Sequence, residues 1–231
     1  MFKKRLILLM IVFSAFPFEN AHPKRKGSHM AKPEIIAHRG GKLNFPENTL
    51  CAFRHNVQQK VAALELDVQV TKDDVVVLYH PEDLSMWTES KGAIADKTAA
   101  EVTALDTSAK YQGPQTYKTQ CNPEELRIPM LNEVLEKIPN MPIVVDFKSL
   151  PAETLIAAVV KSVPEKEWPR LRFYSTSAEH TKALHAQKPD AVIFEDREPS
   201  LKRLMIIDGT NDCKVEKKSA TMDCLRTGAR A

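Results

Sequence analysis

Titratable side chains lie at the ends of four apolar stretches that read as β-strands. The four segments are AHRG at residues 37–40, LELD at 64–67, LYHP at 78–81 and VDFK at 145–148. Glu65 and Asp67 are two residues apart, so both point to the same face of their strand. Asp146 and Lys148 share a face of another strand for the same reason. Buried strands seldom end in so many charges unless an anion and a metal ion meet there, so the pattern predicts an enzyme active site.

The carboxylates of this set predict a metal site. Glu65 and Asp67 offer two hard oxygen ligands on one face, and Asp146 would complete the cage from a separate strand. Carboxylate oxygens are the ligands that Ca²⁺ and Mg²⁺ prefer in proteins. We therefore expect these three residues to hold one divalent cation, Ca²⁺ or Mg²⁺.

The remaining groups can neutralise an anion and move protons. Arg39 presents a planar fork to phosphate oxygens, and Lys148 presents a point charge. His38 and His80 can divide the proton transfers, one as general base and the other as general acid. The other histidines lie on predicted helices or in the N-terminal segment and are expected at the surface: His22, His29, His55, His180 and His185.

The elements that must position these groups alternate between strand and helix. Strands are expected at residues 34–38, 63–70, 75–80, 143–147, 171–174 and 191–194, with helices at 47–60, 131–137, 153–162 and 178–187. This alternation implies an α/β fold with a parallel sheet, and functional groups at successive strand ends are typical of a (β/α)₈ TIM barrel. After residue 194 only residues 204–207 look like a further strand. The barrel is therefore expected to be incomplete or atypical at the C-terminus.

Residues 82–127 interrupt this rhythm. They are polar, with one short helical patch near residues 99–105, and we expect a small inserted lobe over the site, after the third strand. The barrel domain is then placed at residues 34–195, and an atypical C-terminal tail at residues 196–231.

Residues 1–21 have the form of a secretory signal peptide. A basic start at residues 3–5 precedes an apolar run at 6–13, which is shorter than the roughly 20 residues of a membrane-spanning helix. The alternatives are an uncleaved anchor and a buried first helix. We expect residues 22–33 to be a linker and the protein to be periplasmic or secreted, without a stable membrane span.

Four cysteines, at positions 51, 121, 213 and 224, show no close metal-ligand spacing. An exported chain would allow disulfides, and four cysteines can pair in three ways, of which Cys213–Cys224 is the most local. Alternatively, Cys51 is a buried apolar residue on a helix.

The overall charge argues against nucleic-acid binding. The formal net charge is +3, and removal of residues 1–21, with three basic residues and one acidic residue, would leave about +1. No basic run is interleaved with aromatic residues. We therefore expect no nucleic-acid partner.

Several motifs in a fixed order resemble the glycerophosphodiester phosphodiesterases, a family of phospholipase C-like TIM barrels. They are AHRGG followed by FPENTLCAF, then LELDVQVTKDDVVVLYHPEDL, RIPMLNEVLEKIP and VVDFKS. The resemblance covers residues 34–150 and, more loosely, 151–195. It implies hydrolysis of small phosphodiesters, the deacylated phospholipids, to glycerol 3-phosphate and an alcohol, with one divalent cation, Ca²⁺ or Mg²⁺.

The resemblance also implies roles for single residues. His38 would be the general base and His80 the general acid, while Arg39 and Lys148 would bind the phosphate. Glu47, in the PENT motif, would bind substrate, orient Arg39 or a histidine, or touch the metal. Alternatively, Glu47 is only an acid in the first turn of a helix, where the helix dipole favours it.

Departures from the family pattern keep two other functions open. Asp146 stands where the family usually has Glu, and Pro81 where it usually has Asp. Related phospholipase D-type enzymes, acting on lysophospholipids or sphingomyelin, do use an Asp-x-Lys pair at this point. The family's last two strands are not recognisable after residue 195, which would expose a sheet edge. The alternatives are a phospholipase D-like enzyme and a truncated, non-catalytic binder of phospholipid headgroups.

Overall fold

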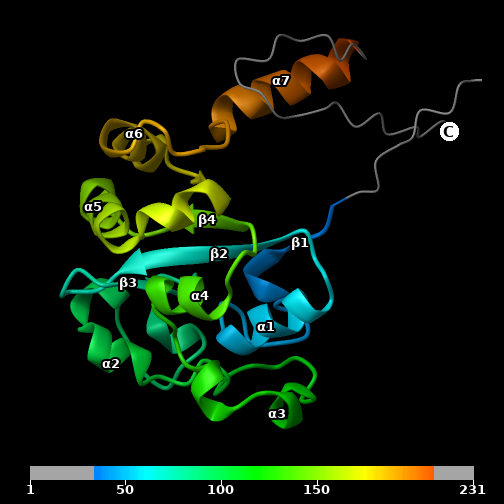
Figure 1. The fold of residues 1–231 in the computed structure, drawn as a ribbon, viewed down its shortest axis with the longest axis vertical. Helices are drawn as coiled ribbons and strands as arrows, with labels where there is room; N and C mark the ends of the chain where they lie inside the picture. Colours follow the sequence, from blue (N-terminus) through cyan, green and yellow to red (C-terminus); the bar gives the residue numbers. More distant parts are fainter. Residues whose placement is uncertain (1–33, 211–231) are drawn as a thin grey trace, which may run out of the picture. The chain divides into compact units, whose positions relative to one another are not determined.

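The computed structural model describes residues 34–210, in which five strands form one sheet (Figure 1). The strands are β1 (Ile36–Ala37), β2 (Ala63–Val70), β3 (Val76–Leu78), β4 (Ile143–Phe147) and β5 (Leu171–Tyr174). They are ordered β1-β2-β4-β5 with parallel neighbours, and β3 pairs with β2 in antiparallel orientation. The expected parallel sheet is therefore present, with β3 as the exception.

The direction of β3 follows from the short link that precedes it. Only residues 71–75 separate β2 from β3, whereas a parallel connection needs a crossover of about a dozen residues or more. Asp74 turns the chain with a left-handed φ of 60°. The returning strand runs back along β2, and the Tyr79 N–H donates to the Asp67 carbonyl at 3.2 Å. His80 therefore arrives beside the middle of β2.

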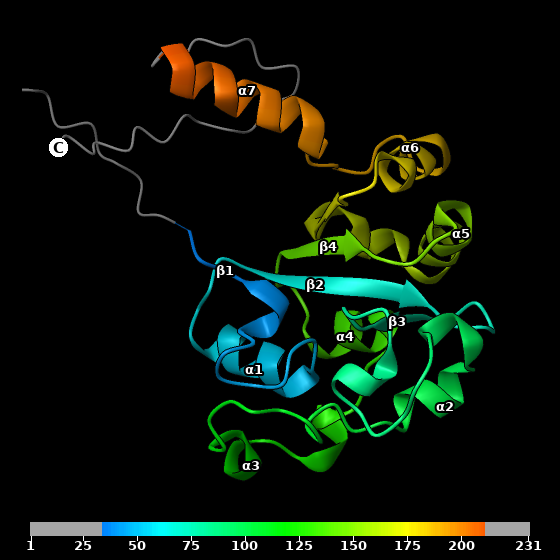
Figure 2. The ribbon, with the colours of Figure 1, turned by 180° about the vertical axis from the view of Figure 1, so that it is seen from behind.

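Four helices accompany the sheet (Figures 1 and 2): α1 (Leu50–Gln58), α4 (Leu131–Lys137), α5 (Ala152–Ser162) and α6 (Ala178–Gln187). The helix predicted at residues 47–60 begins only at Leu50, because the Thr49 side chain accepts the Ala52 N–H as the N-cap. Asn48 lies outside the helix with a φ of 56°. The helix start is thus moved by three residues, which leaves Glu47 and Asn48 in a loop that faces the strand ends.

The main core lies between the sheet and these helices. Leu64, Leu66 and Val68 of β2 are fully buried in it, and Phe147 of β4 stacks on Phe173 of β5 with ring centroids 5.5 Å apart. Because side chains alternate along a strand, Glu65 and Asp67 lie on the opposite face of β2, away from this core.

The sheet is not closed within residues 34–210. The strand predicted at residues 191–194 contributes a single parallel bridge, between Phe173 and Ile193. The strand predicted at residues 204–207 is wrong, because these residues lie in α7 (Arg197–Thr210). Leu201, Lys202 and Arg203 precede this short apolar run. Together with the Leu and Met inside the run, they favour a helix more than its two isoleucines favour a strand.

Residues 82–127 contain only short helices, which pack around two small apolar clusters separate from the main core. The helices are η2 (Leu84–Met86), η3 (Ile94–Asp96), α2 (Ala99–Thr103), α3 (Tyr117–Gln120) and η4 (Pro123–Leu126). The helical patch predicted near residues 99–105 is confirmed by α2. We call residues 82–127 the lobe.

A disulfide joins α1 to the lobe. Cys51 and Cys121 are bonded, with their Cα atoms 5.6 Å apart and a separation of 70 positions in sequence. Beside the bridge, Arg54 of α1 pairs with Glu125 of the lobe at 2.8 Å. Cys51 is also buried on its helix, while the two C-terminal cysteines lie outside the described residues.

The predicted signal peptide (residues 1–21) and linker (22–33), and residues 211–231, also lie outside the described part of the chain. Within residues 34–210, no helix is both long enough and apolar enough to cross a membrane.

Candidate active site

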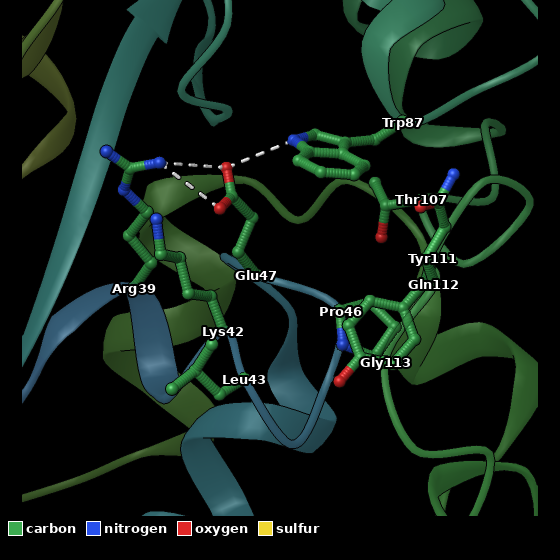
Figure 3. A pocket seen from close by; sticks show the side chains of 10 residues that line it. All are labelled: Arg39, Lys42, Leu43, Pro46, Glu47, Trp87, Thr107, Tyr111, Gln112 and Gly113. Atoms are coloured by element: carbon green, nitrogen blue, oxygen red, sulfur yellow. Dashed lines mark hydrogen bonds and ion pairs between the residues drawn. The ribbon is translucent and has the colours of Figure 1, made fainter.

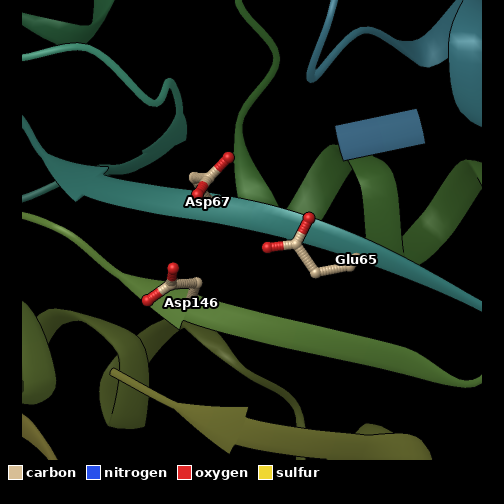
Figure 4. Close-up of side chains that lie close together, drawn as sticks. All are labelled: Glu65, Asp67 and Asp146. Atoms are coloured by element: carbon tan, nitrogen blue, oxygen red, sulfur yellow. The ribbon is translucent and has the colours of Figure 1, made fainter. Parts of the chain in front are cut away.

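Three carboxylates from two neighbouring strands meet in one buried cluster (Figure 4). Asp67 of β2 lies opposite Asp146 of β4 in the parallel register, and Glu65 lies one pleat earlier on β2. One oxygen of each carboxylate lies within 4.8 Å of the others. The exposed fractions are 4% for Glu65, 0% for Asp67 and 2% for Asp146. We call these three residues the acid triad.

Burial makes the negative charge of the acid triad costly. Burial and, second, the neighbouring charge of Asp67 raise the pKa of Glu65 from 4.5 to about 7. Burial likewise raises the pKa of Asp146. Oδ1 of Asp146 accepts no hydrogen bond from any described residue, and Oδ1 of Asp67 has only the ion pair with Lys148. Buried oxygens of this kind suit a hard divalent cation, which would neutralise the charge and use the open lone pairs.

Arg39 is held by carboxylates on three sides. Its backbone N–H donates to Glu65 Oε2 at 2.7 Å, while in its side chain Nε lies 3.3 Å from Asp67 Oδ2 and Nη1 donates to Glu47 Oε2 at 3.2 Å. The backbone bends sharply here, with φ of 53° at Arg39. The next residue must be glycine, because a Cβ on Gly40 would lie 2.9 Å from the side chains of α1. The guanidinium is therefore fixed beside the acid triad.

Lys148 lies just beyond the end of β4 and neutralises part of the acid triad. Its Nζ lies 3.2 Å from Asp67 Oδ1 and donates to Asp146 Oδ2. Burial alone would lower the pKa of Lys148, but the hydrogen bond to Asp146 and the charge of Asp67 outweigh it, and the pKa is raised. Lys148 is therefore a permanent cation at this site.

The two histidines predicted to move protons lie at the same site. His38 is largely exposed, and its Nε2 lies 3.9 Å from Glu65 Oε2. Burial and then the charge of Arg39 lower the pKa of His38. Burial also lowers the pKa of His80, against the opposing charge of Asp67. Both imidazoles are therefore mainly neutral at pH 7.

Glu47 contacts Arg39 and the lobe, not the acid triad. Its carboxylate accepts from Arg39 Nη1 and, at 3.1 Å, from Trp87 Nε1 (Figure 3). Of the roles considered for Glu47, the geometry favours the orientation of Arg39. Because Trp87 belongs to the lobe, Glu47 also ties the lobe to the strand ends.

Sequence reasoning missed two residues that hold the acid triad. Asn48 donates to Asp67 Oδ2 at 2.9 Å and accepts from the Asp67 N–H at 3.1 Å. The Tyr174 hydroxyl donates to Glu65 Oε1 at 3.1 Å. Tyr174 is the last residue of β5. The other site residues were selected because they lie at strand ends, so the same criterion could have identified Tyr174. No local signal reveals the pairing of Asn48 with Asp67.

His180 corrects one expectation. It was expected at the surface, yet only 2% of it is exposed. Its Nδ1 lies 2.9 Å from the Ser175 hydroxyl, and its Nε2 lies 2.8 Å from the Ser149 carbonyl. The imidazole thus joins the segments that follow β4 and β5, next to Lys148 and Tyr174. A polar ring can be buried at this point because both of its nitrogens find partners.

Two pockets lie at this site, one beside Arg39 and the other beside Glu65 of the acid triad. The first, of about 300 Å³, is lined by Arg39 and Glu47 on one side and by the lobe on the other (Figure 3). The second, of about 500 Å³, is lined by His38, Glu65 and Tyr174 together with residues near the end of β5. A two-armed substrate centred on the triad would find room for both arms.

The sequence matches known proteins across this site. The model of the glycerophosphoryl diester phosphodiesterase family matches residues 38–211. An uncharacterised protein of Mycobacterium tuberculosis, Rv2277c, is 31% identical over 187 residues, which are 78% of this chain and 60% of that protein. A human protein named lysophospholipase D is 37% identical over 131 residues, 55% of this chain and 39% of that one. The chain therefore spans 60% or less of the length of these two relatives.

Solved structures share the fold. The glycerophosphoryl diester phosphodiesterase domain of the mycobacterial protein superposes with a TM-score of 0.68 at 28% identity, covering 80% of this chain and 67% of that chain. A phosphodiesterase of Oleispira antarctica, solved with the product sn-glycerol-3-phosphate, superposes with a TM-score of 0.59 at 26% identity, covering 75% of this chain and 72% of that one.

These neighbours are TIM-barrel enzymes, and the open parallel sheet of residues 34–210 is part of that fold, which confirms the predicted fold class. The predicted resemblance is confirmed as well, because the family model covers well over half of the sequence. This chain belongs to the glycerophosphoryl diester phosphodiesterase family.

Proposed function

We propose that this chain hydrolyses glycerophosphodiesters to glycerol 3-phosphate and an alcohol. The observation that carries the proposal is the meeting of the acid triad with two fixed cations and two histidines in a member of this family. The product bound in the relative from Oleispira antarctica supports glycerol 3-phosphate as the product here.

Arg39 and Lys148 would bind the non-bridging oxygens of the diester. Both are already held in place by carboxylates, so little side-chain entropy is lost when the phosphate arrives. Charge that builds on the phosphoryl oxygens then lies next to fixed cations in a buried site, where such stabilisation is strongest.

Glu65, Asp67 and Asp146 would hold one divalent cation, Ca²⁺ or Mg²⁺. A bound cation supplies further positive charge to the phosphoryl oxygens. The fit rests on the burial of all three carboxylates and on Oδ1 of Asp146, which has no hydrogen-bond partner among the described residues. The Tyr174 hydroxyl keeps Glu65 oriented toward its two partners.

The two histidines would carry the protons. His38, as general base, takes the proton of the attacking hydroxyl, whose oxygen lone pair forms the new bond to phosphorus. The bond from phosphorus to the leaving alcohol breaks, its electron pair stays on the alcohol oxygen, and His80, in its protonated imidazolium form, donates a proton there. The attacking hydroxyl belongs either to water or to the neighbouring glycerol carbon. In the second case a cyclic phosphate forms, and water opens it.

A phospholipase D-like activity on lysophospholipids or sphingomyelin is the second candidate. It is supported by the Asp146-x-Lys148 pair and by the printed name of the human relative. The two candidates differ in whether the substrate keeps an acyl chain, so a comparison of glycerophosphocholine with lysophosphatidylcholine separates them.

We also propose an exported location, periplasmic or secreted. The Cys51–Cys121 bridge supports it, because disulfides persist mainly in oxidising compartments. The signal-like residues 1–21 point the same way.

The test of the proposed function is release of glycerol 3-phosphate from glycerophosphoglycerol and glycerophosphocholine, with Mg²⁺ or Ca²⁺ and with EDTA. We expect release with the cation and none with EDTA. His38→Ala and His80→Ala should each abolish turnover, while the exposed His185→Ala should not. Binding without metal-sensitive turnover, in a folded sample, would show a headgroup binder and refute the proposed hydrolysis.

A further inference from the structure

We propose that the pocket of about 300 Å³ beside Glu47 receives the leaving alcohol and selects alcohols that carry hydroxyl groups and no positive charge. This inference rests on the proposed function and names its substrate class. The preferred substrates would be glycerophosphodiesters of polyols, such as glycerol or inositol, over those of choline or ethanolamine. We call this cavity the lobe pocket.

The position of the two histidines assigns the leaving alcohol to the lobe pocket. His38, the proposed base, lines the second pocket, so the attacking hydroxyl belongs there. His80 directly follows Tyr79, whose hydroxyl accepts the Trp87 N–H at 3.3 Å, and Trp87 lies on the wall of the lobe pocket. Because the general acid must reach the leaving oxygen, the alcohol that departs lies on the side of the lobe.

The charge of the lobe pocket disfavours a cationic alcohol. Its only lining carboxylate is Glu47, which is already paired with Arg39 and hydrogen-bonded to Trp87. Lys42 also lines the pocket and makes no ion pair with any residue of 34–210. A trimethylammonium group would therefore meet a free cation and no free anion.

The aromatic rings of the lobe pocket act in the opposite direction, because they attract a cationic alcohol. Trp87 and Tyr111 line the lobe pocket, and ring faces attract cations through their quadrupole. Lys42 is exposed to solvent, which screens its repulsion of a cation, so the attraction by the rings and the repulsion by Lys42 are of similar size. The same ring faces also pack against the C–H groups of a polyol, so the rings do not reverse the preference.

The free polar groups of the lobe pocket can form hydrogen bonds with the hydroxyl groups of an alcohol. Figure 3 shows Lys42 and Gln112 on opposite sides of the cavity. Neither side chain hydrogen-bonds to another described residue, whereas the Thr107 hydroxyl is already used by the Leu126 carbonyl. The ammonium can donate, and the amide can both donate and accept. A polyol offers a partner to each, which choline does not.

Binding and turnover are measured separately to test this inference. In the His80→Ala protein with Mg²⁺, calorimetric titration compares glycerophosphoglycerol with glycerophosphocholine. We expect the polyol diester to bind about tenfold more tightly, the scale of one charge contact. Adding Lys42→Gln should bring the ratio close to one, while Lys91→Gln, an exposed lysine outside the pocket, should leave it unchanged. Gln112→Ala should weaken only the polyol diester.

Equal affinity for the two diesters, including no binding of either, would overturn the inference, as would tighter binding of the choline diester. An unchanged ratio in Lys42→Gln would overturn the role of Lys42 and with it the charge argument. Turnover by the unmodified protein judges the proposed function independently. Selective binding without turnover would support the lobe pocket while refuting hydrolysis.

Discussion

Replacing Glu65 with Gln should stabilise the metal-free protein at alkaline pH while removing a metal ligand. Burial and the charge of Asp67 raise the pKa of Glu65 from 4.5 to about 7. At about 1.4 kcal/mol for each pKa unit, the ionised carboxylate lowers the free energy of unfolding by about 3 kcal/mol. Gln carries no charge and avoids this cost. The Gln side chain also weakens the hydrogen bond from the Tyr174 hydroxyl, worth about 1 kcal/mol. We therefore expect a net gain of about 2 kcal/mol in the free energy of unfolding.

The sign of the pH dependence makes the prediction specific. A carboxyl whose pKa is raised on folding carries no penalty below pH 4.5 and the full penalty above about pH 7. The wild-type protein therefore loses stability from this group as pH rises through that window, and Glu65→Gln does not. The advantage of the variant should be largest at pH 8 and mostly absent at pH 5.

The measurement is urea unfolding, followed by circular dichroism, at pH 5 and pH 8 in EDTA. Glu153→Gln, on the exposed face of α5, is the matched control and should show no pH-dependent difference from wild type. With Mg²⁺ added, the wild type should gain stability, since a bound ligand shifts the equilibrium to the folded state, and Glu65→Gln should gain less. A variant less stable than wild type at pH 8 in EDTA, or one with the same difference at both pH values, would refute the reasoning.

Three further variants test contacts that hold the site. Cys51→Ser opens a link across 70 residues, which should cost about 4 kcal/mol by loop entropy; reductant should lower the urea midpoint of wild type to match, and an insensitive wild type would contradict this. Asn48→Ala removes both hydrogen bonds to Asp67 and places alanine at a φ of 56°, costing about 3 kcal/mol in urea unfolding. Asn48→Gly, which tolerates that φ, should cost less, and an equal cost would rule out backbone strain. His180→Ala should cost about 3 kcal/mol, because it leaves the Ser175 hydroxyl and the Ser149 carbonyl without the ring; a loss below about 1 kcal/mol, typical of exposed positions, would contradict its structural role.

Much of the sheet could be predicted because its signal is local. The bounds of β2, β4 and β5 agree with the predicted strands, since each is a short apolar run with a two-residue period or a fully buried one. The misplaced strand at residues 204–207 had only its apolar composition to support it. Four apolar residues do not distinguish a helix from a strand, and the neighbouring residues favour the helix that is observed.

What the sequence by itself determined is the set of functional groups and the face of the strand that carries them. Glu65 and Asp67 share a face because a strand repeats every two residues, and the apolar residues between them send that face away from the core. The same reasoning placed Lys148 beside Asp146 and predicted that strand ends would converge.

Only the tertiary structure decided which groups touch. Several contacts at the site join residues that are far apart in the chain. They are the strand register that places Asp67 opposite Asp146, the hydrogen bonds of Asn48 and Tyr174 to the acid triad, and the disulfide from Cys51 to the lobe. Such contacts leave no local periodicity to read. The raised pKa of Glu65 has the same origin, because burial and a neighbouring charge exist only once the chain has folded.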